Sequence, residues 1–514
     1  MKLRFCILGL GLVVSLVGSL AAAESGLKPS EDPYQPNWLS LAAHPTPDWF
    51  RDAKFGIYFH WGPYSVPAWD TEWYSRNMYL PRSPAHKHHL KTYGAIDEFG
   101  YKDFIPRFTA EKFDADAWAD LFTEAGAKFA GPVGEHADGF AMWDTKYSRW
   151  NSVAMGPHRD VVAEMERAVR KRGLKFIVTF HHHWLWGWYP TWDPSADTSN
   201  PQFAGLYGPK LPPSAWGTPN PNHPNPNKRG IDVMRPDPMP SEEFCRVWRA
   251  KVQEVIDKYQ PDLLWFDARM NIIREEDRIG FLAYYYNAAA RWGRPVAVTY
   301  KFEDLARGTA ILDLERARLS QKADFPWLTD DSIDWKSWCH IQDPDYKSTK
   351  RIVDELVDIV SKNGCLLLNV TPTAQGEIPG PVVDRLREIG RWLRINGEAI
   401  YGTRPWSSFG EGPTQIVEGH LNERENKDFT AEDIRFTTKG DALYALVMGW
   451  PEGGRARIAS LALGRAEEVA SLSMLGHAGN LEWTQSDKAL LVTLPDPPPC
   501  DHCYALKITF KRCP

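Results

Sequence analysis

The sequence predicts an α/β protein, a (β/α)8-type barrel followed by a C-terminal β-sandwich. Up to about residue 400, short apolar runs that suit buried parallel strands alternate with segments of helical periodicity, and eight such strands are expected. Beyond residue 400 the helical periodicity disappears, and short apolar runs separated by turn residues remain. A chain of 514 residues is long enough for two or three domains with large cores.

The N-terminus has the pattern of a secretory signal peptide, predicted over residues 1–23. A basic start at Lys2 and Arg4 precedes an apolar stretch, and Ala21–Ala23 offers small residues at the cleavage point. No later stretch is long and apolar enough to span a bilayer. We therefore expect a periplasmic or secreted protein with no membrane span once the signal is removed.

Composition argues against one class of partner and favours another. The net charge of -6 is not that of a nucleic-acid-binding protein, which usually carries a basic excess. The chain contains 23 Trp, 19 Tyr and 23 Phe, and such flat apolar faces suit sugars, although a large core also accounts for most of these residues. In an oxidising compartment Cys500 and Cys503 could form a small disulfide, with Cys513 as a competing partner.

Residues 24–400 are assigned to the catalytic barrel. Its strands are expected at residues 54–59, 128–133, 174–180, 263–266, 295–300, 310–314, 338–341 and 365–370. Its principal helices are expected at residues 114–126, 161–172, 241–259, 276–292, 349–363 and 382–396. The strand at 338–341 has the weakest apolar pattern. The segment 188–240, dense in Pro, Asn and Trp, is expected to form an ordered wall of the active site, because long loops in compact domains are usually functional or disordered.

Residues 401–514 are assigned to the β-sandwich. Its strands are expected at residues 433–437, 442–448, 456–463, 489–494 and 504–510.

Ionisable and aromatic residues follow several barrel strands. Asp267 comes directly after the apolar run Leu263–Phe266, and in parallel barrels the active site lies at the C-terminal ends of the strands. The alternative is that Asp267 caps the following helix. The other candidates are His60, Glu72, Trp73, His136 and Glu315. Such a set suits a glycoside hydrolase, in which one carboxylate attacks the anomeric carbon, an acid protonates the departing oxygen, and imidazole and Trp side chains hold the sugar.

The consecutive histidines at 181–183 raise the question of a metal site. Adjacent residues of a regular strand point to opposite faces, so all three cannot reach one ion, and no carboxylate at ligand spacing supports them. We expect no metal. Either His181 or His182 can instead reach a sugar.

Residues 49–406 show a family resemblance. The sequence resembles the α-L-fucosidases of glycoside hydrolase family 29. The matching segments are residues 49–62, 72–74, 136–140, 143–144, 150–152, 156–160, 263–267 and 366–370. They occur in the same order as in the family, and the run Trp265-Phe266-Asp267 is among the most specific.

The resemblance implies an exo-enzyme that removes terminal fucose with retention of configuration from a fucosylated glycan or fucan, without a metal or organic cofactor. It places Asp267 on the family nucleophile. It places the fucose subsite on residues His60, Glu72, Trp73 and His136.

The acid/base is assigned to Glu315, which follows a predicted strand, with Glu303 as the alternative. A purely structural ion pair of Glu315 with Arg316 or Arg318 is the competing interpretation.

One position departs from the family. Many members have two adjacent histidines before Asp-Gly-Phe, whereas here Glu135 and His136 are followed by Ala137. Glu135 is therefore added to the expected substrate contacts, and His182 is added from the run of consecutive histidines. The departure leaves open a modified fucose, for example a sulfated one, another sugar, or a catalytically silent sugar-binding protein on the same fold.

Overall fold

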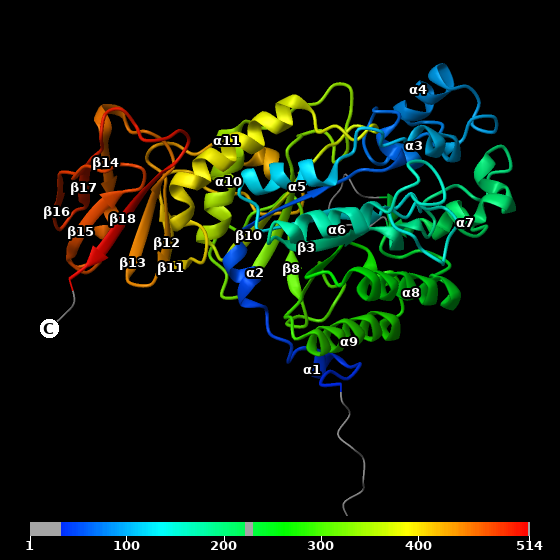
Figure 1. Cartoon of the computed structure of the whole chain (residues 1–514), viewed down its shortest axis with the longest axis horizontal. Helices are drawn as coiled ribbons and strands as arrows, with labels where there is room; N and C mark the ends of the chain where they lie inside the picture. Colours follow the sequence, from blue (N-terminus) through cyan, green and yellow to red (C-terminus); the bar gives the residue numbers. More distant parts are fainter. Residues whose placement is uncertain (1–31, 221–229, 512–514) are drawn as a thin grey trace, which may run out of the picture.

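The computed structural model describes residues 32–220 and 230–511 (Figure 1). The predicted signal peptide and Cys513 therefore lie outside the described residues, as does most of the Pro-rich run at 219–226. No helix within the described ranges has the length and apolar character needed to cross a membrane.

Eight parallel strands close a barrel, which confirms the predicted fold class. Their order around the barrel is β1-β10-β9-β8-β7-β6-β3-β2. Their bounds are β1 Phe55–Phe59, β2 Phe129–Glu135, β3 Lys175–Phe180, β6 Leu263–Phe266, β7 Ala297–Lys301, β8 Ile311–Asp313, β9 Trp327–Ser332 and β10 Gly364–Val370. Apart from a few residues of β3 and β8, the strands are wholly buried, as expected for a parallel sheet covered on both faces.

The seventh strand is a correction to the sequence prediction. It is β9 at Trp327–Ser332, whereas residues 338–341 form a loop at the barrel mouth. The strand contains two buried carboxylates, Asp330 and Asp331, which are paired with Lys301 and Lys347. A search for apolar runs misses such a strand because its charges are neutralised only by residues distant in sequence.

Helices surround the barrel in Figure 1. The longer ones are α5 Ala115–Glu124, α6 Val161–Lys171, α8 Glu242–Tyr259, α9 Glu275–Trp292, α10 Thr349–Ser361 and α11 Gly380–Asn396. The shorter ones are α1 Trp38–Leu41, α2 Asp48–Ala53, α3 Tyr74–Asn77, α4 Pro84–Thr92 and α7 Ala204–Tyr207. Several begin where an N-cap side chain accepts a backbone N–H, as Asp114 and Ser241 do.

The C-terminal domain contains two antiparallel sheets that share one core. The five-stranded sheet has the order β11-β12-β13-β18-β15, and the three-stranded sheet has the order β14-β17-β16. Their bounds are β11 Arg404–Glu411, β12 Ile434–Lys439, β13 Ala442–Val447, β14 Arg455–Ile458, β15 Val469–Met474, β16 Trp483–Gln485, β17 Leu490–Thr493 and β18 Tyr504–Phe510. Apolar side chains from both sheets, such as Phe436 and Leu490, pack together, which is the predicted sandwich.

The described cysteines are free thiols, including Cys500 and Cys503. The small disulfide considered from the sequence is therefore not formed between these two residues.

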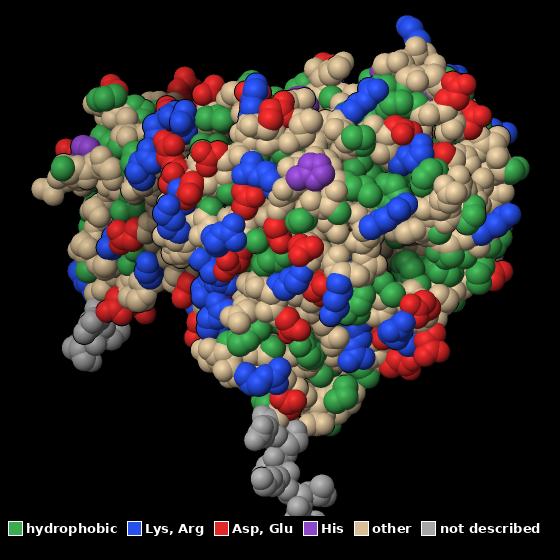
Figure 2. All heavy atoms as spheres, turned by 45° about the vertical axis from the view of Figure 1, so that its right-hand side comes forward, with side chains coloured by type: hydrophobic (Ala, Val, Ile, Leu, Met, Phe, Trp, Pro, Cys, Tyr) green, Lys and Arg blue, Asp and Glu red, His purple; other side chains and the backbone are tan. Residues whose placement is uncertain are grey.

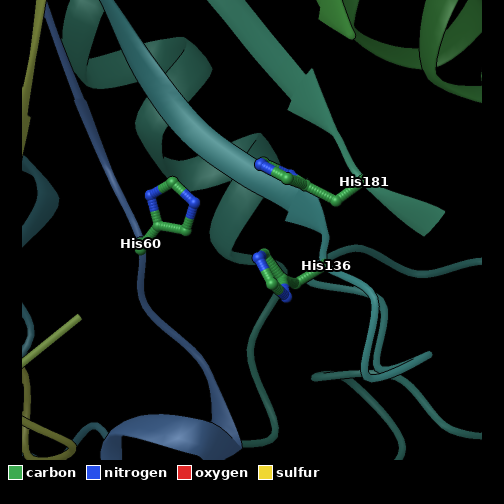
Figure 3. A group of neighbouring side chains, drawn as sticks. All are labelled: His60, His136 and His181. Atoms are coloured by element: carbon green, nitrogen blue, oxygen red, sulfur yellow. The ribbon is translucent and has the colours of Figure 1, made fainter. Parts of the chain in front are cut away.

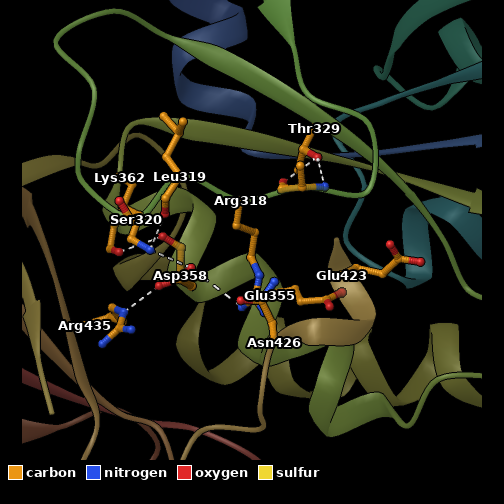
Figure 4. Close-up of polar contacts among 12 residues, drawn as sticks. Arg318, Leu319, Ser320, Thr329, Glu355, Asp358, Lys362, Glu423, Asn426 and Arg435 are labelled. Atoms are coloured by element: carbon orange, nitrogen blue, oxygen red, sulfur yellow. Dashed lines mark hydrogen bonds and ion pairs between the residues drawn. The ribbon is translucent and has the colours of Figure 1, made fainter. Parts of the chain in front are cut away.

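A buried ionic cluster joins the two domains (Figure 4). Asp358 of α10 accepts from Arg435 of β12 at 2.6 Å and from Lys362 at 2.9 Å, and Arg318 lies 3.7 Å away. Burial by itself raises the pKa of Asp358, but the three cations outweigh it and hold that pKa well below its usual range. The carboxylate is therefore charged and serves as the common partner of both domains.

We expect Asp358→Ala to destabilise the protein by about 3–5 kcal/mol, because it leaves buried cations without their counter-ion. Asp384→Ala, an exposed position on α11, should change stability by less than about 0.5 kcal/mol. Calorimetric unfolding of both variants checks this. Equal unfolding midpoints for the two would contradict it.

Candidate active site

A cavity of about 1360 Å³ opens at the C-terminal ends of the barrel strands. Eight residues singled out from the sequence line it, namely His60, Glu72, Trp73, His136, His181, Asp267, Glu303 and Glu315. They come from segments spread over more than 250 residues of the chain, and the barrel brings them together. This is the location expected for the active site of a parallel barrel.

Four of the lining residues occupy equivalent positions. His60 directly follows β1, His136 follows β2 and His181 follows β3. Asp267 directly follows β6. These strands are neighbours in the barrel, so the side chains form a continuous arc at its mouth. Figure 3 shows the three imidazoles facing one another, and their ring centroids lie 4.4 to 5.3 Å apart.

Asp267 lies in an environment that disfavours its charge. Burial raises its pKa well above the ordinary value, and the negative charge of Glu315 adds to the rise. The positive charge of Lys301 and a backbone hydrogen bond from Ala268 act in the opposite direction. Two carboxyl groups in one cavity are the arrangement in which one can serve as acid and the other as nucleophile.

Glu315 lies two residues beyond β8 and has contacts on two sides. Lys301 Nζ is 3.3 Å from its carboxylate, and His420 Nε2 is 3.7 Å away. The backbone N–H of Leu421 donates to the Glu315 carbonyl at 3.0 Å. Arg316, a competing partner considered from the sequence, instead pairs with Glu423 at 2.8 Å. The contacts of Glu315 therefore face the cavity and the connection between β11 and β12 of the C-terminal domain.

Lys301 is a central residue that the sequence did not single out. It ends β7, is 1% exposed, and contacts Asp313 at 2.9 Å, Asp330 at 2.7 Å and Glu315 at 3.3 Å. Although burial lowers its pKa, the surrounding carboxylates raise it well above the ordinary value. The ammonium group is therefore a fixed positive charge between the floor of the cavity and Glu315.

One side of the cavity is aromatic. The ring of Trp73 packs against Trp184, Trp188 and Trp216, with centroids 4.8 to 5.9 Å apart. Trp188 and Trp216 belong to the long insertion, whose hairpin β4 Thr218–Asn220 and β5 Gly230–Asp232 precedes further lining residues. The insertion thus forms part of the wall, as the sequence suggested.

Glu72 lies beside this aromatic wall and is 4% exposed. Burial raises its pKa to about 7. Its carboxylate accepts from the backbone N–H of Trp338 at 3.2 Å.

Comparison with known proteins decides the family. The model of the alpha-L-fucosidase family matches residues 21–398, and that of the alpha-L-fucosidase C-terminal domain matches residues 426–509. The chain belongs to the alpha-L-fucosidase family. Alpha-L-fucosidases are glycoside hydrolases, so the protein is an enzyme of that class.

Individual relatives resemble the chain over nearly its whole length. The tissue alpha-L-fucosidase of Rattus norvegicus is 31% identical over 533 residues, covering 99% of each chain. The tissue alpha-L-fucosidase of Homo sapiens is 30% identical, covering 95% of each. The crystal structure of Thermotoga maritima alpha-fucosidase in complex with fucose superimposes with a TM-score of 0.72 at 30% identity, covering 93% of this chain and all of that one.

Two expected substrate contacts of this fucosidase need correction. Among the described residues that line the cavity, Glu135 and His182 are not found. Glu135 is fully buried and accepts two hydrogen bonds, at 2.7 and 2.9 Å, from Lys251 of α8. The ring of His182 stacks on that of Trp248, also in α8. Because neighbouring residues of a strand point to opposite faces, the inward orientation of His136 and His181 turns these two towards the helices.

We expect Lys251→Met to act on stability and not on sugar binding. It leaves the Glu135 carboxylate buried without its cation, which costs about 3–5 kcal/mol, while the KM for a fucoside should not change. Lys258→Met, on the same helix but more exposed, should cost less than about 1 kcal/mol. A raised KM with unchanged thermal stability in Lys251→Met would show that Glu135 contacts the substrate after all.

Proposed function

We propose that this fucosidase is an exported, retaining exo-enzyme that removes terminal α-L-fucose from fucosylated oligo- or polysaccharides. The observation that supports it most is the pair of carboxyl groups, Asp267 after β6 and Glu315 after β8, which line one cavity, where the charge of Glu315 raises the pKa of Asp267. Export is supported by the signal pattern in residues 1–23. Residues 24–400 would form the catalytic domain and residues 401–514 the sandwich domain.

The proposed reaction takes two steps. Asp267 attacks the anomeric carbon, and Glu315 gives its proton to the departing glycosidic oxygen, so that a fucosyl ester of Asp267 forms as the glycosidic bond breaks. Glu315, now a carboxylate, takes a proton from water, whose oxygen attacks the same carbon and releases Asp267. Lys301, at 3.3 Å, stabilises the charged form of Glu315 between the two steps.

We assign the fucose subsite to the part of the cavity lined by His60, Glu72, Trp73 and His136. His60, His136 and Glu72 offer hydrogen-bonding groups to the hydroxyls, and the Trp73 ring offers an apolar face. We add His181 to this set, because it projects inward from β3 beside His136 and can supply the contact that Ala137 lacks.

The face of the molecule in Figure 2 has charges of both signs. Acidic and basic side chains are interspersed over it, so it offers no continuous basic surface of the kind that binds nucleic acid.

Azide rescue tests the two assignments. Asp267→Ala should lose activity on an aryl α-L-fucoside by at least about 10²- to 10⁴-fold. Glu315→Ala should regain activity with azide and release fucosyl azide of the α configuration, because azide replaces water in the second step. Glu303→Ala is the matched control and should keep wild-type activity without azide. Rescue in Glu303→Ala and not in Glu315→Ala would reassign the acid/base. A β-configured azide from Glu315→Ala would contradict the assignment of Glu315 as acid/base, because direct displacement by azide is expected when the nucleophile has been removed.

The pH dependence of kcat/KM tests the electrostatic coupling. Only ionised Asp267 can attack, so its raised pKa sets a rate that falls as pH decreases through that value. Glu315→Gln removes a negative charge that raises this pKa, so the acid limb should move to lower pH when the aryl leaving group needs no proton. Glu303→Gln should leave the acid limb in place. An unmoved limb in Glu315→Gln, or the same displacement in both variants, would contradict the coupling.

A further inference from the structure

The imidazoles of His60, His136 and His181, which line the cavity, form a compact nitrogen cluster. One nitrogen from each of His60, His136 and His181 lies within 4.8 Å of the other two. The residues are 3%, 5% and 4% exposed. Figure 3 shows the rings directed into one common space from the ends of three neighbouring strands.

Hydrogen bonds fix the ring of His60 in one tautomer. Its Nδ1–H donates to Asn369 Oδ1 at 2.9 Å. The amide nitrogen of Asn369 donates to Ser332 Oγ and to the Trp338 carbonyl, so the amide oxygen must face His60. The lone pair of His60 is therefore on Nε2. An imidazole held through its other nitrogen by an amide or carbonyl oxygen is the usual arrangement of a metal-binding histidine.

The other two rings each have a buried nitrogen that is available to a ligand. Within the described structure, Nδ1 of His136 and Nδ1 of His181 are buried without a hydrogen-bond partner.

The surroundings favour a cation. Acidic residues outnumber Lys and Arg among the described residues that line the cavity. Lys301, a fixed positive charge among the lining residues, is compensated by Asp313, Asp330 and Glu315. A divalent ion beside the imidazoles would therefore meet a net negative environment.

We propose that His60, His136 and His181 form a binding site for Zn²⁺, and that the ion occupies the fucose subsite and inhibits hydrolysis competitively. Three imidazoles with one open position are an established ligand set for zinc, and imidazole suits zinc better than it suits Mg²⁺ or Ca²⁺. Zn–N bonds of about 2.0–2.1 Å need nitrogens about 3.5 Å apart. Each of the three nitrogens thus needs to move inward by about 1 Å to reach bonding distance of a shared ion.

This site is inhibitory and is not a cofactor site. The expectation of no metal considered the consecutive histidines 181–183, whereas the cluster takes one histidine from each of three strands. The competition with substrate rests on the proposed function, because it assumes that the sugar uses the same imidazoles. Binding of the ion does not rest on it.

Titration of the tag-free, full-length protein with ZnCl₂ in a calorimeter, without substrate, tests the site. We expect one strong site in the wild type. His181→Phe should weaken Zn²⁺ binding by at least about tenfold, the lower end of the loss when a group supporting a metal site is removed. His182→Phe is the matched control, because His182 is the adjacent histidine, points away from the cavity, and keeps an aromatic ring against Trp248. It should bind as the wild type does.

Circular dichroism verifies that both variants are folded, and His60→Asn replaces His181→Phe if the latter unfolds. No Zn²⁺ binding by the wild type, undiminished binding in the site variant, or equal losses in the site and control variants would each overturn the proposal.

L-Fucose should weaken Zn²⁺ binding, and Zn²⁺ should raise the KM of the fucoside without changing kcat. Zn²⁺ binding that fucose leaves unchanged would overturn the placement in the subsite. An inactive wild type that still binds Zn²⁺ at these residues would refute only the proposed function.

Discussion

The buried ammonium group of Lys301 is the interaction on which the geometry of the site depends. It contacts Asp313 of β8, Asp330 of β9 and Glu315 beyond β8, so a single positive charge joins three strands and the proposed acid/base. Removing such charges from water is costly, and the group is tolerated because it is surrounded by carboxylates. Its charge also opposes the rise in the pKa of Asp267. The same cluster thus contributes to the barrel core and to the electrostatics of Asp267, the proposed nucleophile.

The loop that carries Glu315 is held from the outside as well. Leu421 and His420, in the connection between β11 and β12 of the C-terminal domain, contact Glu315, and Glu423 of that connection pairs with Arg316. Residues 418–421 also line the cavity. The ionic cluster around Asp358 fastens the sandwich to α10 nearby. The C-terminal domain therefore supports one wall of the catalytic cavity, which gives it a role beyond that of an appended module.

Much of this arrangement could be predicted from the sequence, because it depends on local patterns. Apolar runs located seven of the eight barrel strands, and the residue directly after a strand was a good guide to the site at His60, His136 and Asp267. The sequence did not predict β9, because its carboxylates are neutralised by lysines distant in sequence. It did not single out Lys301, because the carboxylates that pair with this residue are also distant in sequence. The orientation of the Glu135 side chain could not be predicted in this way. The register of β2 is irregular between Val133 and Glu135, so the alternation of inward and outward side chains cannot be counted from the start of the strand.

The central claim is that Asp267 forms a covalent bond to the sugar during turnover. The most direct measurement is reaction of the enzyme with 2-deoxy-2-fluoro-α-L-fucosyl fluoride, followed by intact-mass analysis and peptide mapping. The account predicts one added fluorofucosyl group, attached to the peptide that contains Asp267 and absent from Asp267→Ala. A label on another residue would contradict the assignment, and turnover of the reagent with inversion and without any adduct would contradict the mechanism.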